Sequence, residues 1–137
     1  MATGPKTTPV TDMKTGLEGL QILVVEDEVL VAMDIEDMLL DLKCEPVGPA
    51  STIKTALEIV RSAVKLDGVL LDMNLHGQTV LPVVEELISR GVPFVLVTGY
   101  ARRDEDPSAM RDAPRLNKPF AVKTLSKAMT STFVKSI

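Results

Sequence analysis

The sequence predicts an α/β fold with one doubly wound, five-stranded parallel sheet in the strand order 2-1-3-4-5. Strand-length apolar runs alternate with segments whose apolar residues repeat at helical spacing, a pattern typical of βα units. Three of the runs are wholly apolar, which favours central strands that are buried on both faces. The other two contain or adjoin prolines, which favour the sheet edges because proline cannot donate to a central ladder.

Composition bounds the class of protein. The chain has 137 residues, of which 45% are hydrophobic and 25% charged, as expected for one globular domain. Its net charge of −4 gives no electrostatic footprint for nucleic acid or an anionic membrane surface. No apolar run approaches the roughly 20 residues of a membrane helix. The single cysteine, Cys44, cannot form an internal disulfide, so we expect a cytoplasmic protein.

The N-terminal part combines a tail with the first βα unit. Residues 1–18 lack periodic apolar spacing, so we expect a flexible tail before a folded domain of residues 19–137. Ile22–Val25 is the first strand, and acidic residues follow it. The next helix has one apolar stripe, formed by Val31, Ile35, Met38, Leu39 and Leu42. Its opposite, solvated face carries Asp34, Asp37 and Asp41.

The second and third units follow the same pattern. Cys44–Pro49 is a weak strand broken by prolines, and Ser51 or Thr52 can cap the helix after it. The apolar stripe of that helix is Ile53, Ala56, Leu57, Val60 and Val64. The third strand, within Gly68–Leu75, stops abruptly at Asp72. A further helical stripe consists of Val80, Val83, Val84, Leu87 and Ile88, with Pro82 in the first turn and Gly91 as the stop.

The apolar patterns of the last two βα units differ in clarity. Phe94–Val97 is a wholly apolar fourth strand. Residues 101–112 are rich in charge and poor in apolar side chains, so we expect a short or mobile helix. Arg115–Asn117, bracketed by prolines, is the fifth strand and the second edge. The final helix buries Val122, Leu125, Met129 and Phe133.

Five polar residues fall at the carboxyl ends of the predicted strands, where ligands bind in open α/β sheets: Glu26, Asp27, Asp72, Thr98 and Lys118. Three adjacent carboxylates repel one another unless a cation neutralises them, and oxygen ligands alone select a hard ion such as Mg²⁺. Lys118 and Thr98 supply a positive charge and a hydroxyl donor for phosphoryl oxygens. A carboxylate at the centre of such a site can take a phosphoryl group as an acyl phosphate.

Four motifs stand where the predicted strands end: Val24-Val25-Glu26-Asp27-Glu28, Leu70-Leu71-Asp72-Met73-Asn74, Val97-Thr98-Gly99 and Asn117-Lys118-Pro119-Phe120. Together they resemble the receiver domain of two-component response regulators. The resemblance covers about residues 20–137 and implies a flavodoxin-like (βα)5 domain. It also implies that Asp72 accepts a phosphoryl group from a sensor histidine kinase. Asp27 would ligate Mg²⁺ directly, Glu26 largely through water, and Asn74 through its backbone carbonyl.

The resemblance assigns further roles. Thr98 and Lys118 would contact the phosphoryl oxygens, the bond between Lys118 and Pro119 would be cis, and the first helix would dock the kinase. Family members usually carry Tyr or Phe three residues before the lysine, where this chain has Arg115. The stretch from Pro93 to Tyr100 is partly similar to the FAT GUY receiver subgroup, which lacks that aromatic residue.

We take Gly99 and Tyr100 as switch candidates, and expect Tyr100 and the residues after Gly99 to report phosphorylation by becoming ordered.

Because the chain ends after its last helix, we expect a stand-alone response regulator. As a phosphoprotein of a two-component system, it would relay phosphate, act as a phosphate sink, or contact an unknown downstream protein. It would not be an enzyme beyond slow self-dephosphorylation. One alternative is a pseudo-receiver that binds a partner without phosphorylation. Another is an aspartyl-phosphate phosphatase, which the position of Asp72 on the third strand disfavours.

Overall fold

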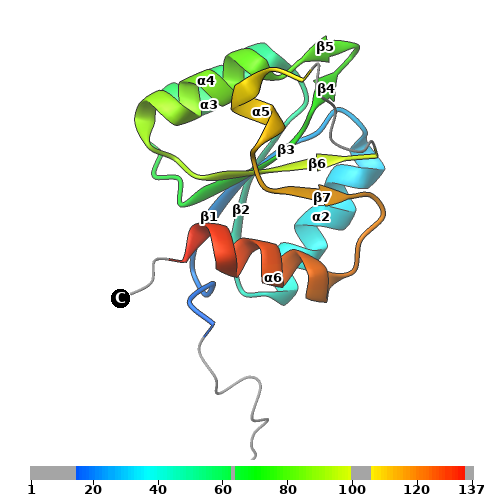
Figure 1. Cartoon of the computed structure of the whole chain (residues 1–137). Coiled ribbons are helices and arrows are strands. Elements are labelled where there is room, and N and C mark those ends of the chain that lie inside the picture. Colours follow the sequence, from blue (N-terminus) through cyan, green and yellow to red (C-terminus); the bar gives the residue numbers. More distant parts are fainter. Residues whose placement is uncertain (1–14, 63, 100–105, 135–137) are drawn as a thin grey trace, which may run out of the picture.

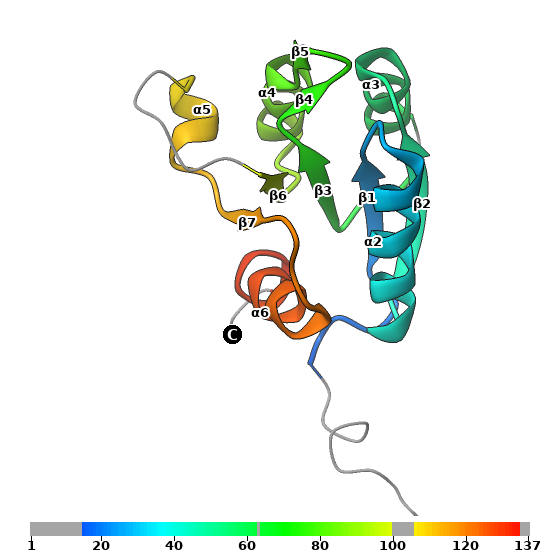
Figure 2. The same cartoon turned by 90° about the vertical axis from the view of Figure 1, so that its right-hand side faces the viewer.

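The central sheet has the predicted topology. The computed structural model describes residues 15–62, 64–99 and 106–134. Five strands lie side by side in the order β2-β1-β3-β6-β7, and every neighbouring pair is parallel (Figures 1 and 2). They are β1 (Gln21–Val25), β2 (Glu45–Ala50), β3 (Gly68–Asp72), β6 (Phe94–Thr98) and β7 (Arg115–Asn117). When only these five strands are numbered along the chain, their order is the predicted 2-1-3-4-5. The strands marked by prolines lie at the two edges.

Helices cover both faces of the sheet. They are α2 (Val29–Asp41), α3 (Ile53–Arg61), α4 (Leu81–Arg90), α5 (Ser108–Arg111) and α6 (Val122–Phe133). Helices α2 and α6 pack on one face, and α3, α4 and α5 pack on the other (Figure 2). In the described part of the chain, no helix is both long and apolar enough to span a bilayer.

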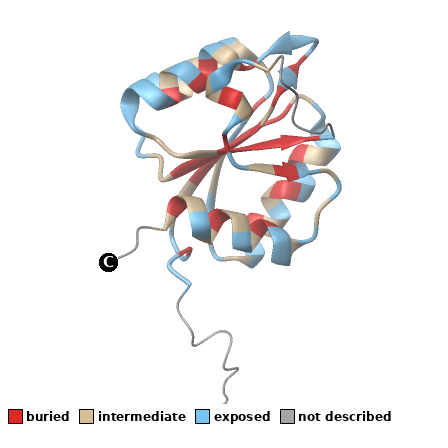
Figure 3. Cartoon of the chain, viewed as in Figure 1, coloured by how far each residue is buried: buried red, intermediate tan, exposed pale blue. Residues whose placement is uncertain are grey.

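The three inner strands supply the core of both layers (Figure 3). Successive side chains of a strand point to opposite faces, so Leu70 packs with α2 and α6 while its neighbours Val69 and Leu71 pack with α3 and α4. The side chains of Val95 and Leu96 on β6 divide in the same way. Burial on both faces explains why these strands are continuous apolar runs in the sequence.

The helix ends follow the predicted signals. The Thr52 hydroxyl accepts a hydrogen bond from the Thr55 amide at 3.1 Å and caps α3. Pro82 lies in the first turn of α4, and Gly91 ends that helix in the left-handed conformation at φ 68°. Two members of the predicted stripes are exposed, and several others are only partly buried. Val64 lies beyond the end of α3 and is 46% exposed, and Ile88 is 53% exposed because Val84 and Leu87 already fill the inner face of α4.

Leu17 belongs to the packed structure although it falls within the predicted tail. Its side chain is fully buried, and its carbonyl accepts a hydrogen bond from the Cys44 thiol at 3.3 Å. Burial raises the pKa of Cys44 to about 11, so the thiol stays protonated near neutral pH. Residues 1–14 lie outside the described ranges, and the division into tail and domain stays a prediction there.

A short hairpin, which the sequence patterns did not predict, follows β3. Strands β4 (Asn74–Leu75) and β5 (Gln78–Thr79) pair antiparallel. The two residues between them have positive φ values, 50° at His76 and 78° at Gly77. This is the backbone that a tight two-residue hairpin turn requires. The hairpin directs the chain back past the end of β3.

We expect Gly68→Ala to destabilise the domain by about 1–3 kcal/mol, because a methyl group there overpacks the core. A Cβ atom at residue 68 would lie 2.7 Å from three ring atoms of Phe133, which is 8% exposed on α6. Thermal or denaturant unfolding measures the loss. Gly99→Ala is the matched control, since no atom of the described residues lies within 4 Å of its added Cβ. Equal stability of the two variants would contradict this account of the packing.

Candidate functional site

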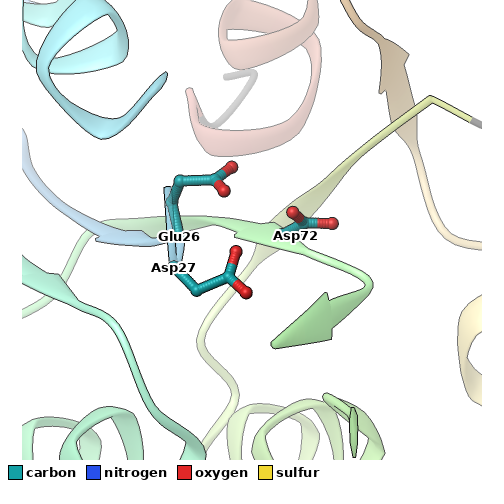
Figure 4. Close-up of side chains that lie close together, drawn as sticks. All are labelled: Glu26, Asp27 and Asp72. Atoms are coloured by element: carbon teal, nitrogen blue, oxygen red, sulfur yellow. The ribbon is translucent and has the colours of Figure 1, made fainter. Parts of the chain in front are cut away.

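Three carboxylates meet where β1 and β3 end. Glu26 and Asp27 directly follow β1, and Asp72 is the last residue of the neighbouring strand β3. One oxygen of each side chain lies within 4.8 Å of the other two. The carboxylates turn toward a common space at the sheet edge (Figure 4). Parallel pairing of β1 with β3 causes the meeting, because it brings the carboxyl ends of both strands to one edge.

Lys118 reaches the same cluster from the end of β7. Its ammonium Nζ lies 3.0 Å from Glu26 Oε1 and 3.0 Å from Asp72 Oδ2. The Lys118 amide donates to the carbonyl of Thr98 at 2.8 Å, which ties the residue to the end of β6. The peptide bond from Lys118 to Pro119 is cis, as is the bond from Gly48 to Pro49. One ammonium therefore bridges two of the three carboxylates.

The environment shifts the proton affinities of these groups in different directions. Glu26 is only 2% exposed, and burial raises its pKa although the hydrogen bond from Lys118 opposes the shift. The backbone N–H of His76 donates to Asp27 Oδ2 at 2.8 Å and lowers the pKa of Asp27. Burial disfavours the charge of Lys118, but the hydrogen bonds to Glu26 and Asp72 outweigh it and raise the pKa of Lys118.

The cluster suits a hard divalent cation. With Glu26, Asp27 and Asp72 ionised, Lys118 neutralises one of the three negative charges and leaves an excess of two. All three candidate ligands are carboxylate oxygens, the donor type that Mg²⁺ prefers. The single histidine of the chain, His76, lies near the cluster. Its imidazole Nδ1 is 3.8 Å from Asp27 Oδ2, and its side chain is 61% exposed.

The other predicted residues lie around this cluster. Asn74 is exposed, and its backbone N–H donates to Asp72 Oδ1 at 3.4 Å. Thr98 is buried at the end of β6, one position beyond the partner of Asp72 in the β3–β6 pair. Tyr100 lies outside the described residues. A cleft of about 430 Å³ opens beside the cluster, and its lining consists of Glu28, Asp72, Asn74, Gly99 and Lys118.

Two residues near the site were not assigned a role from the sequence. His76 contributes its backbone amide to Asp27, a contact that depends on the unforeseen hairpin turn. Glu28 lines the cleft, and its amide donates to Glu26 Oε2 at 3.1 Å. No sequence signal marks the His76 amide, because any residue with an N–H group provides the same donor.

We expect Glu26→Gln to raise the melting temperature of the metal-free protein near neutral pH. The raised pKa of Glu26 means that folding is penalised when this carboxylate is ionised, and glutamine removes the charge. As the pH falls toward the raised pKa, the wild-type carboxylate takes up a proton in the folded state and the penalty disappears. The difference in melting temperature should therefore shrink on acidification. A melting temperature of Glu26→Gln below the wild-type value at neutral pH would contradict this.

Curated relatives align with most of this chain. The transcriptional regulatory protein PdtaR of Mycobacterium tuberculosis is 32% identical over 127 residues, which is 90% of this chain and 60% of PdtaR. The chain thus spans little more than half the length of this relative. No model of a known protein family matches the sequence.

Solved structures share the fold. The solution structure of SdrG from Sphingomonas melonis Fr1 is 41% identical, with a TM-score of 0.72, and the match covers 87% of this chain and 98% of SdrG. A response regulator receiver protein from Sinorhizobium medicae is 26% identical, with a TM-score of 0.72 and coverage of 84% and 94%.

Another solved structure shares the fold at lower sequence identity. The receiver domain of the sensor histidine kinase PA1611 from Pseudomonas aeruginosa is 22% identical, with a TM-score of 0.74 and coverage of 85% and 99%. That structure has a magnesium ion coordinated in its active-site cleft. The match shows a shared fold. With SdrG matched over nearly its full length and the acidic cluster at the end of β3, the chain belongs to the response regulator receiver domain family.

Proposed function

We propose that this receiver domain accepts a phosphoryl group on Asp72 from a sensor histidine kinase in a reaction that requires Mg²⁺. The observation that carries the proposal is that Asp72 contacts an ammonium group and also lies close to two other carboxylates. Its Oδ2 lies 3.0 Å from Lys118 Nζ, and its carboxylate belongs to the cluster with Glu26 and Asp27. The open cleft beside Asp72 gives a donor access to the nucleophile.

The transfer is a displacement at phosphorus. A carboxylate oxygen of Asp72 forms a new bond to phosphorus while the bond from phosphorus to the donor imidazole breaks. The imidazole leaves with the electron pair of that bond, and Asp72 becomes an acyl phosphate. The backbone N–H of Asn74, which donates to Asp72 Oδ1 at 3.4 Å, helps to orient the carboxylate.

Lys118 and Thr98 act on the charge of the transferred group. The Lys118 ammonium already lies beside the attacking carboxylate, so little reorganisation is needed for it to contact a phosphoryl oxygen. Thr98 lies at the end of β6, where its hydroxyl would contact a phosphoryl oxygen, and its carbonyl accepts a hydrogen bond from the Lys118 amide at 2.8 Å. A stationary positive charge and a hydroxyl donor stabilise the negative charge that spreads over the phosphoryl oxygens.

Glu26, Asp27 and Asp72, with the backbone carbonyl of Asn74, would hold Mg²⁺. When bound, the ion supplies positive charge to the phosphoryl oxygens. The role of Glu26 follows from its surroundings: it is buried and shares Lys118 with Asp72, so it completes the negative potential that retains a cation.

The first helix of the domain, α2, offers a surface on which a kinase can dock. Four of its apolar side chains are largely exposed, and three of them lie in its first half: Val29 at 71%, Leu30 at 80% and Met33 at 53%, with Leu40 at 59% near the other end. A groove of about 400 Å³ runs from this helix to the segment after Lys118. Its lining residues include Leu30, Ile35 and Phe120. A helix docked there would lie next to the phosphoacceptor site.

Intact mass spectrometry tests the proposal. The chain is incubated with a small acyl phosphate or phosphoramidate donor, with Mg²⁺ or with a chelator. We expect one phosphoryl adduct that forms only with the divalent ion and maps by fragmentation to Asp72. No adduct under a large excess of donor would overturn the proposal and favour a pseudo-receiver. Continuous release of phosphate from simple phosphate esters would instead indicate a phosphatase.

A further inference from the structure

Arg115 is a buried charge at the edge of the sheet. It is the first residue of β7, three residues before Lys118, and its side chain is 7% exposed. A guanidinium group keeps its charge in proteins, so burial requires partners of opposite charge or carbonyl oxygens. The contacts of this one side chain therefore show which segments it holds together.

The guanidinium joins helix α5 to the residue after the phosphoacceptor. Its Nη2 donates to the carbonyl of Met110 at 3.1 Å and lies 3.8 Å from Asp106 Oδ2. Its Nη1 lies 3.8 Å from the sulfur of Met73, which directly follows Asp72 in the chain. The side chain of Asp106 is 14% exposed, so this ion pair is screened by water only in part. One side chain thus contacts both the phosphoacceptor loop and α5.

Helix α5 depends on such anchoring. It comprises only four residues, Ser108–Arg111, which is too short to be stable in isolation. Met110 is its one fully buried side chain, and the Met110 carbonyl is the atom that Arg115 binds. The Nε of Arg115 is buried and lacks a hydrogen-bond partner among the described residues, so the arrangement leaves one donor of the guanidinium unsatisfied. Arg115 of β7 therefore binds α5 at the Met110 carbonyl and pairs with Asp106, which lies two residues before the helix begins.

We propose that Arg115 is a positioning residue that anchors α5 and couples its position to the state of Asp72. A change in the loop at Met73 alters the surroundings of the guanidinium, and the guanidinium transmits it to Met110 and Asp106. In this chain the charged side chain of Arg115 stands at the position, three residues before Lys118, where similar receiver domains usually carry Tyr or Phe. The anchoring of α5 holds in the unmodified protein, whereas the coupling rests on the function proposed for Asp72.

Hydrogen exchange at α5 provides the test. The amides of Met110 and Arg111 both donate to the Pro107 carbonyl at 2.8 Å and report whether the helix is formed. Exchange is measured by NMR in the wild type, Arg115→Met and Arg115→Lys, with and without beryllofluoride as a mimic of the acyl phosphate. The control variant is Lys127→Met, which removes an exposed charge on α6. Fluorine NMR reports beryllofluoride bound at the site.

We expect Arg115→Met to speed exchange at these amides by about tenfold or more, because the helix loses a charged hydrogen bond and an ion pair. Arg115→Lys should restore part of the protection, and Lys127→Met should match the wild type. Beryllofluoride should change the exchange at α5 in the wild type but not in Arg115→Met, although it binds to both. A purely structural role would also speed exchange in the central strand β3 and would leave the response to beryllofluoride intact.

Two results would overturn the inference. One is wild-type protection of α5 in both Arg115 variants. The other is a response of α5 to beryllofluoride that persists in Arg115→Met or is missing from the wild type when the mimic is bound. Failure of the wild type to bind beryllofluoride at all would refute the coupling together with the function proposed for Asp72. The exchange rates of the unmodified proteins would still decide whether Arg115 anchors α5.

Discussion

Asp72→Asn is expected to abolish phosphoryl uptake from a small donor in the presence of Mg²⁺. Asparagine keeps the shape of the side chain, but its neutral amide is not a nucleophile for phosphorus. It also removes one of the three clustered carboxylates and the acceptor of the ion pair with Lys118. Intact mass spectrometry of both proteins over the same time course measures the effect, and the adduct should fall to background.

The control for this substitution is Asp34→Asn, which makes the same chemical change on the exposed face of α2. This variant should take up the phosphoryl group as fast as the wild type. Because Asp72→Asn reduces repulsion among carboxylates, its melting temperature should not fall, so that loss of uptake is separable from unfolding. An adduct on Asp72→Asn at the wild-type rate would place the acceptor elsewhere.

Lys118→Met is expected to slow phosphoryl uptake by about a hundredfold or more, the usual cost of removing a group that stabilises charge in a transition state. Methionine keeps the apolar stem but removes the ammonium that lies 3.0 Å from Asp72 Oδ2. The buried carboxylate of Glu26 then loses its ion-pair partner as well. The initial rate of adduct formation at saturating Mg²⁺ measures the effect.

The matched control is Lys123→Met, an exposed lysine in the first turns of α6. It should leave the rate unchanged. Lys118→Arg keeps the positive charge but places it differently, so we expect a rate between those of the wild type and Lys118→Met. Uptake by Lys118→Met within a few-fold of the wild-type rate would show that the ammonium is a structural counter-ion only.

The strand order could be predicted because burial and hydrogen bonding leave separate marks in the sequence. Wholly apolar runs such as Val69–Leu71 mark inner strands, and Pro46 and Pro114 mark the edges, since proline lacks an amide hydrogen. The meeting of Glu26, Asp27 and Asp72 then follows from parallel pairing. Their roles in phosphoryl transfer stay predictions.

Features that depend on long-range packing could not be read from the sequence. Leu17 is a single apolar residue in a polar stretch, so no periodicity indicates that it is buried. The turn at His76 and Gly77 lacks the usual Asn-Gly or Asp-Gly pair, and its contact with Asp27 spans distant parts of the chain. Arg115 carries a charge that sequence patterns place at the surface, and only the surrounding residues of α5 show why it is buried.

The prolines of β2 also bear on how this molecule behaves in a crowded solution. The Glu45 amide donates to the Leu20 carbonyl at 2.8 Å and so faces the interior of the sheet. Along a strand successive backbone groups alternate in direction, so the nitrogen of Pro46 faces outward and carries no hydrogen. A strand from another molecule that paired with this edge would lack the hydrogen bond from a backbone N–H at Pro46. It would also lie beside the charge of Glu45. The domain is therefore protected from aggregating by strand addition on this side.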